Sequence, residues 1–286
     1  GFNLISRLLI EPGDTIVMED PCYQGAAFVM ESLGGRLHPV AVDDEGIDVS
    51  SMPETPNSIV YVTPSHQYPM GVTLTLPRRL ALLAWANRND AYVIEDDYDS
   101  DFRFTGSPIT ALKGLDRGNR VIYMGTFSKC MGPGLRLGFL VLPPHLAEAA
   151  KRLKTLMNNG HSWLEQAAMA DFMLEGGYRR HLRRVRQVYI ERRDALLRSL
   201  KTHFGPCKVS GEDAGMHLVW TIPDAFADAG EIERRALENG IGVYTLSSGA
   251  ALHLGSEGAD ERHLVLGYAA LTPREIEMGI SRLANV

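Results

Sequence analysis

The chain has 286 residues, of which 45% are hydrophobic and 22% are charged, and its formal net charge is -6. This composition is typical of a globular protein with one large core or two lobes, and the acidic balance argues against a broad nucleic-acid-binding face. The apolar runs are far shorter than the roughly 20 residues that a membrane helix requires, and the first residues show no signal-peptide pattern, so we expect no contact with a membrane.

The first half of the chain alternates short apolar runs with helical patterns. Several runs are apolar at successive positions, which is typical of strands that are covered on both faces. The runs expected to form strands are 15–19, 37–42, 59–63, 91–95, 121–126 and 136–142, and the helices between them are 24–33 and 77–89. This alternation predicts an α/β fold with a mostly parallel central sheet flanked by helices.

The pattern changes after Pro143 and Pro144. Helical periodicity dominates this part of the chain, and strands are few. We expect helices over 146–157, 162–175, 178–200, 229–239 and 273–283, and strands over 215–222 and 264–269. The sequence therefore predicts a large lobe, residues 1–180, followed by a smaller α+β lobe, residues 181–286.

The first residues are unusual for the start of a domain. Apolar side chains at helical spacing predict a helix that ends at the Pro12–Gly13 pair, but no residue precedes Gly1 that could cap the first turn. We therefore expect the chain to begin within the large lobe, with part of that lobe upstream of Gly1.

The three cysteines, Cys22, Cys130 and Cys207, are widely spaced along the chain. Their spacing matches neither a metal site nor the cysteine framework of a disulfide-stabilised secreted protein. We therefore expect a reducing compartment and a cytoplasmic protein.

An acidic segment, "EDDYDSDFR" (95–103), overlaps the end of one expected strand. Its alternate aspartates have the spacing of a calcium loop: Asp97, Asp99 and Asp101. A calcium loop would also need glycine at its sixth position and glutamate at its twelfth, where this chain has Phe102 and Pro108. We therefore expect no metal site here.

The acidic segment is better interpreted in two parts. Asp99 and Asp101 are expected in a solvated turn, whereas Asp96 still belongs to the buried end of the strand. Because open α/β sheets bind ligands at the carboxyl ends of their strands, Asp96 is a candidate site residue.

A lysine follows another expected strand, in the segment "GTFSKCMGPGLRLGF" (125–139). Taken alone, Lys129 is interpreted as an ordinary surface lysine. However, it shares its strand end with Thr126, Ser128 and, beyond a glycine-proline-glycine turn, Arg136. Hydroxyls and a guanidinium bind phosphate, and a lysine among cations in a partly dry site loses its proton readily and can form an imine.

Pyridoxal phosphate requires all of these groups. Its aldehyde needs a lysine, its phosphate needs hydroxyls and an arginine, and its pyridine nitrogen needs a carboxylate that keeps it protonated. The segments around Asp96 and Lys129 therefore predict a pyridoxal 5'-phosphate site.

Three segments in order, "TPSHQYPMG" (63–71), "EDDYDSDFR" and "GTFSKCMGPGLRLGF", resemble aminotransferases of fold type I. They are most similar to the aminotransferase-like domain of MocR-type transcription regulators of the GntR superfamily, and the similarity extends along essentially the whole chain. The resemblance implies a fold type I protein with a smaller α+β C-terminal lobe, and a homodimer whose sites use residues of both subunits.

The resemblance also implies roles for single residues. Lys129 would be the catalytic Schiff-base lysine, Asp96 would pair with the pyridine nitrogen, and Tyr98 would hydrogen-bond the phenolic oxygen. The phosphate would be held by a set of three: Thr126, Ser128 and Arg136. Tyr23 would lie over the ring face, although an ordinary core aromatic is an equally good interpretation of that residue.

The chain departs from the family pattern at two positions. Tyr68 takes the place of the asparagine in the family's asparagine-proline-threonine-glycine loop, so either His66 or Gln67 is expected to contact the cofactor instead. Val265 stands where the aminotransferases carry a carboxylate-binding arginine, and Arg262 lies three residues earlier. The expected ligand is an amine or amino acid that is bound without an arginine at the position of Val265.

Two functions agree with the resemblance. In the first, the chain is the effector-sensing domain of a MocR-type regulator, in which an amine replaces Lys129 by transimination at the internal aldimine. DNA would then be bound only by a winged helix-turn-helix domain upstream of Gly1. In the alternative, the chain is an active class I/II aminotransferase in which Lys129 acts as general base. The segment "EDDYDSDFR" and the missing arginine favour the sensor.

A third hypothesis comes from the arginine-rich segment 179–198, which could form a nucleic-acid surface. Its arginines are interleaved with apolar residues at helical spacing, and Glu191 and Asp194 offset part of the charge. A solvated or interlobe helix face is the favoured interpretation.

Overall fold

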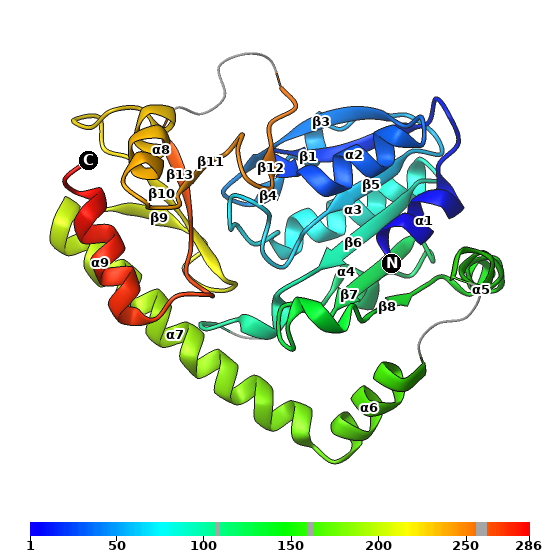
Figure 1. The fold of residues 1–286 in the computed structure, drawn as a ribbon. Coiled ribbons are helices and arrows are strands. Elements are labelled where there is room, and N and C mark those ends of the chain that lie inside the picture. Colours follow the sequence, from blue (N-terminus) through cyan, green and yellow to red (C-terminus); the bar gives the residue numbers. More distant parts are fainter. Residues whose placement is uncertain (107–108, 159–162, 256–261) are drawn as a thin grey trace.

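The computed structural model describes residues 1–106, 109–158, 163–255 and 262–286, and Figure 1 shows two lobes of unequal size. The larger lobe contains a seven-stranded sheet with the order β4-β3-β1-β5-β6-β7-β8. Its strands are β1 (Thr15–Asp20), β3 (Arg36–Asp43), β4 (Gly46–Ile47), β5 (Ile59–Val62), β6 (Tyr92–Asp97), β7 (Val121–Thr126) and β8 (Gly138–Val141). The five strands from β3 to β7 are parallel, and only the edge strands β4 and β8 are antiparallel to their neighbours.

The large sheet is covered on both faces because its strands send alternate side chains in opposite directions. In β5, Val60 belongs to a core that includes residues of α3, whereas Ile59 and Tyr61 belong to a second core with residues of α1 and α2. The helices of this lobe are α1 (Phe2–Leu9), α2 (Gln24–Ser32), α3 (Leu76–Arg88), α4 (Leu112–Leu115) and α5 (Pro144–Asn158). The predicted α/β fold with a mostly parallel sheet is therefore confirmed.

The smaller lobe is built on a four-stranded antiparallel sheet with the order β11-β13-β10-β9. Its strands are β9 (Lys208–Ser210), β10 (His217–Thr221), β11 (Tyr244–Thr245) and β13 (His263–Gly267), and its helices are α8 (Ala229–Glu238) and α9 (Pro273–Leu283). A short pair, β2 (Cys22–Tyr23) with β12 (Ala251–Leu252), joins this part of the chain to the large lobe.

Two further helices precede the small sheet, α6 (Trp163–Leu174) and α7 (Gly177–Phe204). In Figure 1, α7 runs from α6 toward the small lobe, where α9 packs against it. Its C-terminal half supplies Ala195, Leu196 and Leu200 to the small-lobe core, while most arginines of its N-terminal half are exposed. The exposure of these arginines agrees with the solvated face favoured for segment 179–198, and the proposed lobe division at residue 180 falls within this helix.

Every long helix and strand expected from the sequence is present, and the differences occur at short elements. Sequence patterns did not indicate the two- and three-residue strands β2, β4, β9, β11 and β12, or the 3-10 turns Val49–Ser51, Ser100–Phe102 and Pro133–Leu135. The strand expected over 136–142 begins only at Gly138, because Arg136 adopts a left-handed conformation (φ 51°, ψ 32°). The helix expected over 162–175 starts outside the described residues at Ser162. Within the described ranges, no helix is both long and apolar enough to cross a membrane.

One buried cation ties α3 to the two loops that follow β5 and β6. The guanidinium of Arg79 donates to three backbone carbonyls, those of Pro64 (2.6 Å), Leu74 (2.9 Å) and Thr110 (3.2 Å). It also lies 3.9 Å from Glu95, and both side chains are fully buried. Because buried carbonyls and carboxylates need partners, this residue holds the loop that starts at Thr63 and the end of β6 in place.

We expect Arg79→Met to lower the free energy of unfolding by about 3–5 kcal/mol, because it leaves Glu95 as a buried charge beside unpaired carbonyls. Arg88→Met in the same helix is the matched control. Arg88 is 59% exposed and pairs with the exposed Glu54, so its replacement should cost no more than about 1 kcal/mol. Denaturant titration of both variants measures the difference, and equal costs would show that the buried pair is not structural.

Candidate functional site

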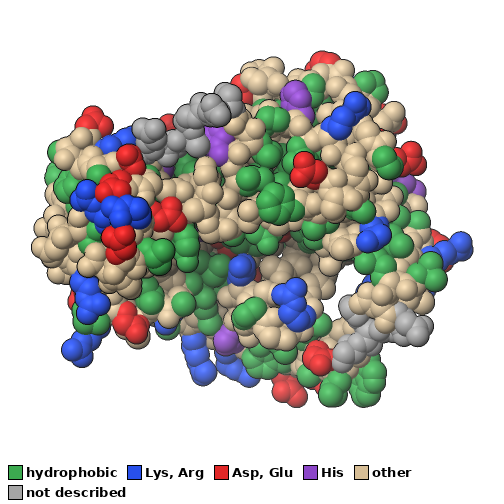
Figure 2. All heavy atoms as spheres, turned by 45° about the horizontal axis from the view of Figure 1, so that its top comes forward, with side chains coloured by type: hydrophobic (Ala, Val, Ile, Leu, Met, Phe, Trp, Pro, Cys, Tyr) green, Lys and Arg blue, Asp and Glu red, His purple; other side chains and the backbone are tan. Residues whose placement is uncertain are grey.

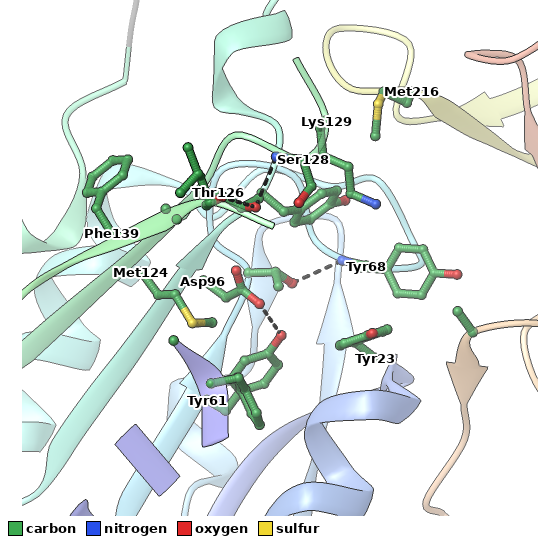
Figure 3. Close-up of a pocket in the computed structure, with 18 of the residues that line it drawn as sticks. Tyr23, Tyr61, Tyr68, Asp96, Met124, Thr126, Ser128, Lys129, Phe139 and Met216 are labelled. Atoms are coloured by element: carbon green, nitrogen blue, oxygen red, sulfur yellow. Dashed lines mark hydrogen bonds between the residues drawn. The ribbon is translucent and has the colours of Figure 1, made fainter. Parts of the chain in front are cut away.

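The candidate site lies at the carboxyl edge of the large sheet. In the parallel register, Asp96 of β6 is level with Met124 of β7, and β7 ends at Thr126. A pocket of about 420 Å³ opens at this edge, and Figure 3 shows residues from both lobes around it. This volume is within the range of small-molecule sites in proteins, roughly 300–1,000 Å³.

Two cations line the pocket, Lys129 and Arg136. Among the described residues, neither the Lys129 amine nor the Arg136 guanidinium has a hydrogen bond or ion pair. Arg136 has a positive φ, which costs a residue with a side chain about 1–2 kcal/mol. Backbone strain of this kind concentrates at functional sites, and unpaired cations there indicate an anionic ligand.

Two hydroxyl residues line the pocket beside these cations. The Oγ1 of Thr126 accepts a hydrogen bond from the backbone N–H of Ser128 (3.1 Å), which closes the turn after β7. Figure 3 shows both side chains on the loop that carries Lys129. The structure thus places the three residues predicted to bind the phosphate in the same pocket as the predicted lysine, Lys129. These three residues are Thr126, Ser128 and Arg136.

Asp96 is the acid of the pocket. Its carboxylate accepts a hydrogen bond from the Tyr61 hydroxyl (2.7 Å), as Figure 3 shows. Burial raises the pKa of Asp96 to about 6, and the neighbouring Asp97 and Asp99 add to this rise, while Tyr61 and Lys129 oppose it. A carboxylate in such surroundings is stabilised when a cation is placed against it, as a protonated pyridine nitrogen would be.

Tyr98 lines the pocket, but His66 does not, and the two are connected behind the pocket wall. The Tyr98 hydroxyl donates to the His66 carbonyl (2.9 Å), and the His66 ring lies 3.2 Å from the same hydroxyl. The Nδ1 of His66 is 2.8 Å from Asp99, and both residues are only 2% exposed. The structure therefore places His66 as a support for Tyr98.

The expected solvated turn is wrong for Asp99, which is a buried partner of His66. Asp101 is exposed, in agreement with the expectation, and accepts a hydrogen bond from Tyr178. The sequence could not distinguish the two aspartates because their burial depends on a histidine 33 positions away along the chain.

Buried polar contacts with the end of β1 and the residue that follows it hold the loop 63–71 in place. Gln67 donates to the carbonyls of Pro21, outside the loop, and Tyr68, within it (2.8 Å each), so both N–H donors of its side chain are already paired. Glu19, at the end of β1, accepts from the backbone N–H (3.0 Å) and hydroxyl (2.7 Å) of Thr63, and burial raises its pKa to about 7. Tyr68 stands at the position of the family asparagine, and His66 and Gln67 were the residues expected to replace its contact. Of these three, only Tyr68 lines the pocket.

Tyr23 lies at the pocket mouth and is 40% exposed. Its ring meets Tyr68 edge to face, with the ring centroids 6.1 Å apart. The alternative interpretation of Tyr23 as an ordinary core aromatic is therefore wrong, and its ring is available to a ligand.

Sequence reasoning missed three residues of the site: Glu19, Tyr61 and His217. Glu19 ends β1 in the same way that Asp96 ends β6, so the strand-end argument could have found it. Tyr61 and His217 carry no local signal, because what brings them to the pocket is the parallel register of β5 with β6 and the packing of the small lobe.

The residues at this edge fit the cofactor that the sequence predicts. The pocket offers unpaired cations and hydroxyls to a phosphate, a half-buried acid to a pyridine nitrogen, a tyrosine to a phenolic oxygen and an amine to an aldehyde. These charges are complementary to pyridoxal phosphate, and the pocket has room for a molecule of this kind.

The chain is similar to known regulators and to known aminotransferases. It is 39% identical, over its whole length, to 57% of a probable rhizopine catabolism regulatory protein MocR from Rhizobium meliloti. It is 32% identical, again over its whole length, to 69% of aromatic-amino-acid aminotransferase 1 from Thermococcus litoralis. The structure of kynurenine aminotransferase from Pyrococcus horikoshii superposes with a TM-score of 0.88 at 29% identity, over 99% of this chain and 71% of that one.

The chain thus spans less than three fifths of the regulator it matches. The family model for class I and II aminotransferases matches residues 2–283, and proteins of this family depend on pyridoxal phosphate. Together with the fold type I architecture and the charges of the pocket, this match shows that the chain belongs to the class I and II aminotransferase family.

Proposed function

We propose that the chain is the pyridoxal-phosphate-binding, effector-sensing domain of a MocR-type transcription regulator. One observation carries this proposal: the complete lysine, aspartate and arginine set of the pocket occurs in a chain that is more similar to a regulator than to an aminotransferase. The upstream DNA-binding domain, the cytoplasmic location and the homodimer belong to the same proposal.

When bound, the cofactor supplies an aldehyde that condenses reversibly with primary amines. Lys129 is the only lysine among the described residues that line the pocket, and Figure 3 shows its Nζ on the same side as Tyr68. Asp96 would keep the proton on the pyridine nitrogen, Arg136 would offset the charge of the phosphate, and the hydroxyls of Thr126 and Ser128 would hydrogen-bond it. Tyr98 would contact the phenolic oxygen, and His66 holds the Tyr98 hydroxyl from outside the pocket.

If an effector amine took the place of Lys129, the Nζ would be free to bind the proton that the effector ammonium gives up. The new ammonium lies within electrostatic range of Asp96 and Asp99. Asp99 and His66 in turn pack directly against Gly215 of the small lobe, where an added Cβ would lie 2.6 Å from Asp99 and closer still to His66. A shift of this buried pair would therefore move the small lobe. In this way, effector binding could change the position of the small lobe relative to the large lobe.

Exposed apolar side chains support the proposed homodimer. Trp163 is 73% exposed and Leu174 is 86% exposed, and both lie on α6. Figure 2 shows one face of the molecule, with hydrophobic side chains gathered at its lower edge and a hollow between the two lobes. Large exposed apolar groups of this kind mark surfaces that bind another protein.

An active aminotransferase is the second candidate function, and the similarity to a Thermococcus litoralis enzyme over the whole chain favours it. In that case the freed Lys129 amine would move a proton at the substrate α-carbon. Both functions use the same residues, so the pocket does not separate them.

Lys129→Ala should shift the visible absorbance of the cofactor-loaded, full-length protein to that of the free cofactor aldehyde, because Lys129 is the only lysine among the described residues that line the pocket. Lys151→Ala, in the exposed part of α5, is the matched control and should remain yellow. Borohydride reduction followed by peptide mapping should place the pyridoxyl group on the peptide that contains Lys129. A Lys129→Ala protein that kept the visible spectrum of the unchanged protein would contradict the assignment.

Cofactor affinity should fall as the pH is lowered through about 6, where Asp96 takes up a proton in the cofactor-free protein. Below this pH the loss should approach tenfold per pH unit, because the protonated acid no longer attracts the pyridine cation. Above it, Asp96→Asn should bind the cofactor more weakly than the unchanged protein.

The control for this experiment is the same Asp96→Asn variant across the pH range. It retains the titration of the cofactor phosphate but loses that of Asp96, so its affinity should change less steeply. Identical pH profiles for the two proteins would show that Asp96 does not hold the cofactor.

The two candidate functions separate in the full-length protein. A sensor should change its DNA affinity several-fold when a ligand amine shifts the cofactor spectrum, and it should convert at most about one equivalent of that amine. Electrophoretic mobility shift and product analysis measure these quantities. Repeated turnover with no change in DNA affinity would establish the aminotransferase instead.

A further inference from the structure

The turn that carries Lys129 lies against the N-terminal half of α7. This turn, residues 127–131, follows β7 and is closed by a hydrogen bond from the backbone N–H of Met131 to the carbonyl of Phe127 (2.8 Å). Residues spaced by three or four positions share one face of a helix, and α7 presents such a face to the turn. The side chains of α7 that contact the turn are Tyr178, His181 and Tyr189.

Tyr178 connects the turn to the segment that follows β6. Its hydroxyl donates to the carboxylate of Asp101 (2.9 Å) and lies 3.3 Å from the thiol of Cys130, which is next to Lys129. Its ring also meets that of Phe127 edge to face, with the ring centroids 5.9 Å apart. Burial raises the pKa of the Tyr178 phenol, so the hydroxyl keeps the proton that it donates. One side chain of α7 therefore holds the segments that follow two neighbouring strands.

His181 and Tyr189 hold the backbone of the same turn. The Nε2 of His181 lies 2.7 Å from the carbonyl of Cys130, and because a carbonyl can only accept, Nε2 donates this hydrogen bond. The Tyr189 hydroxyl donates to the carbonyl of Lys129 over a longer distance, 3.4 Å. The two carbonyls are consecutive in the chain. α7 therefore fixes the backbone from which the Lys129 side chain extends.

The same helix continues into the small lobe. α7 has 28 residues and is therefore about 42 Å long, and Figure 1 shows it as one unbroken helix. At its C-terminal end it supplies three buried side chains to the small-lobe core: Ala195, Leu196 and Leu200. A rigid helix of this kind can carry a displacement from one site to another. It joins the turn of Lys129 to the small lobe by a connection that is separate from the contact of Asp99 and His66 with that lobe.

We infer that Tyr178 and His181 are positioning residues for Lys129. They hold the turn in the place from which the Lys129 amine reaches the cofactor, and they make α7 respond when an effector amine takes the place of Lys129. This inference rests on the proposed function, because it concerns the same exchange of amines in the same pocket.

Positioning strengthens Lys129 in its competition with a free amine. An amine that is held beside its target reacts as though its concentration were very high, and part of this advantage is lost when a group that holds it is removed. Removal of either contact with α7 should therefore let a free amine displace Lys129 at a lower concentration. The loss of one hydrogen bond supports a change of about two- to tenfold.

Tyr178→Phe and His181→Leu each remove one of these contacts, and methylamine, the smallest primary amine, is the probe. The full-length, cofactor-loaded protein is titrated with methylamine and reduced with borohydride at each concentration. Reduction traps the cofactor either on the Lys129 peptide or on methylamine, and mass spectrometry gives the methylamine concentration at half displacement. We expect this concentration to fall about two- to tenfold in each variant.

Two further variants serve as controls. His181→Gln keeps an N–H that can donate to the Cys130 carbonyl, so its half displacement should stay within about twofold of that of the unchanged protein. Tyr92→Phe removes a hydroxyl at the start of β6, where its partner is His145 (2.7 Å), and should leave half displacement unchanged. Thermal melting of every variant measures any loss of stability separately.

Amide hydrogen exchange tests the link to α7. In the unchanged protein, saturating methylamine should raise the exchange of the amides over 178–189 several-fold, because the turn that packs on this part of α7 loses the tether of its lysine to the cofactor. The double variant Tyr178→Phe/His181→Leu separates the turn from the helix. Methylamine should therefore leave the exchange of these amides unchanged in the double variant.

The outcomes separate this inference from the function on which it rests. If half displacement is the same in both variants as in the unchanged protein, the inference fails and the sensing function stands, even where melting shows lost stability. An effect of Tyr92→Phe as large as that of Tyr178→Phe, or an equal response of α7 in the double variant, also overturns the inference. If borohydride places no pyridoxyl group on Lys129 of the unchanged protein, both fail. Because two positions are changed independently, a variant that does not retain the cofactor leaves the other as the test.

Discussion

The parallel register of β5, β6 and β7 is the constraint on which the rest of the site depends. It ends three strands at one edge, so that Tyr61, Asp96 and Thr126 meet although up to 65 positions separate them in the sequence (126 minus 61). Parallel strands need a crossover between them, and α3 and α4 with their loops provide it here. The strand ends therefore carry the polar groups, while the strands themselves remain apolar and fully covered.

Buried polar contacts then fix the loops at this edge. Arg79 holds the carbonyl of Pro64, Glu19 holds Thr63, and Asp99 holds the ring of His66. Each contact would be costly if one partner were lost, because the other would remain buried and unpaired. The same contacts place Tyr68 and Tyr98 at the pocket. Buried polar pairing therefore both fixes the loop and determines which side chains form the pocket wall.

The charges of the pocket are arranged unevenly. The two cations lie on the loop after β7, the acid lies on β6, and the wall supplied by the small lobe is neutral at His217 and Met216. This distribution matches a cofactor with an anionic phosphate and a protonated ring nitrogen.

The sequence by itself determined the order of the long helices and strands, the α/β class, and the residues that emerge at strand ends, above all Asp96, Lys129 and Arg136. These features are local, because apolar periodicity and turn residues act over a few neighbouring positions. Only the tertiary structure decided that Asp99 is buried, that His66 stands behind Tyr98, that Tyr23 is exposed, and that His217 lines the pocket. Burial and pairing depend on which segments pack together, and no short stretch of sequence contains that information.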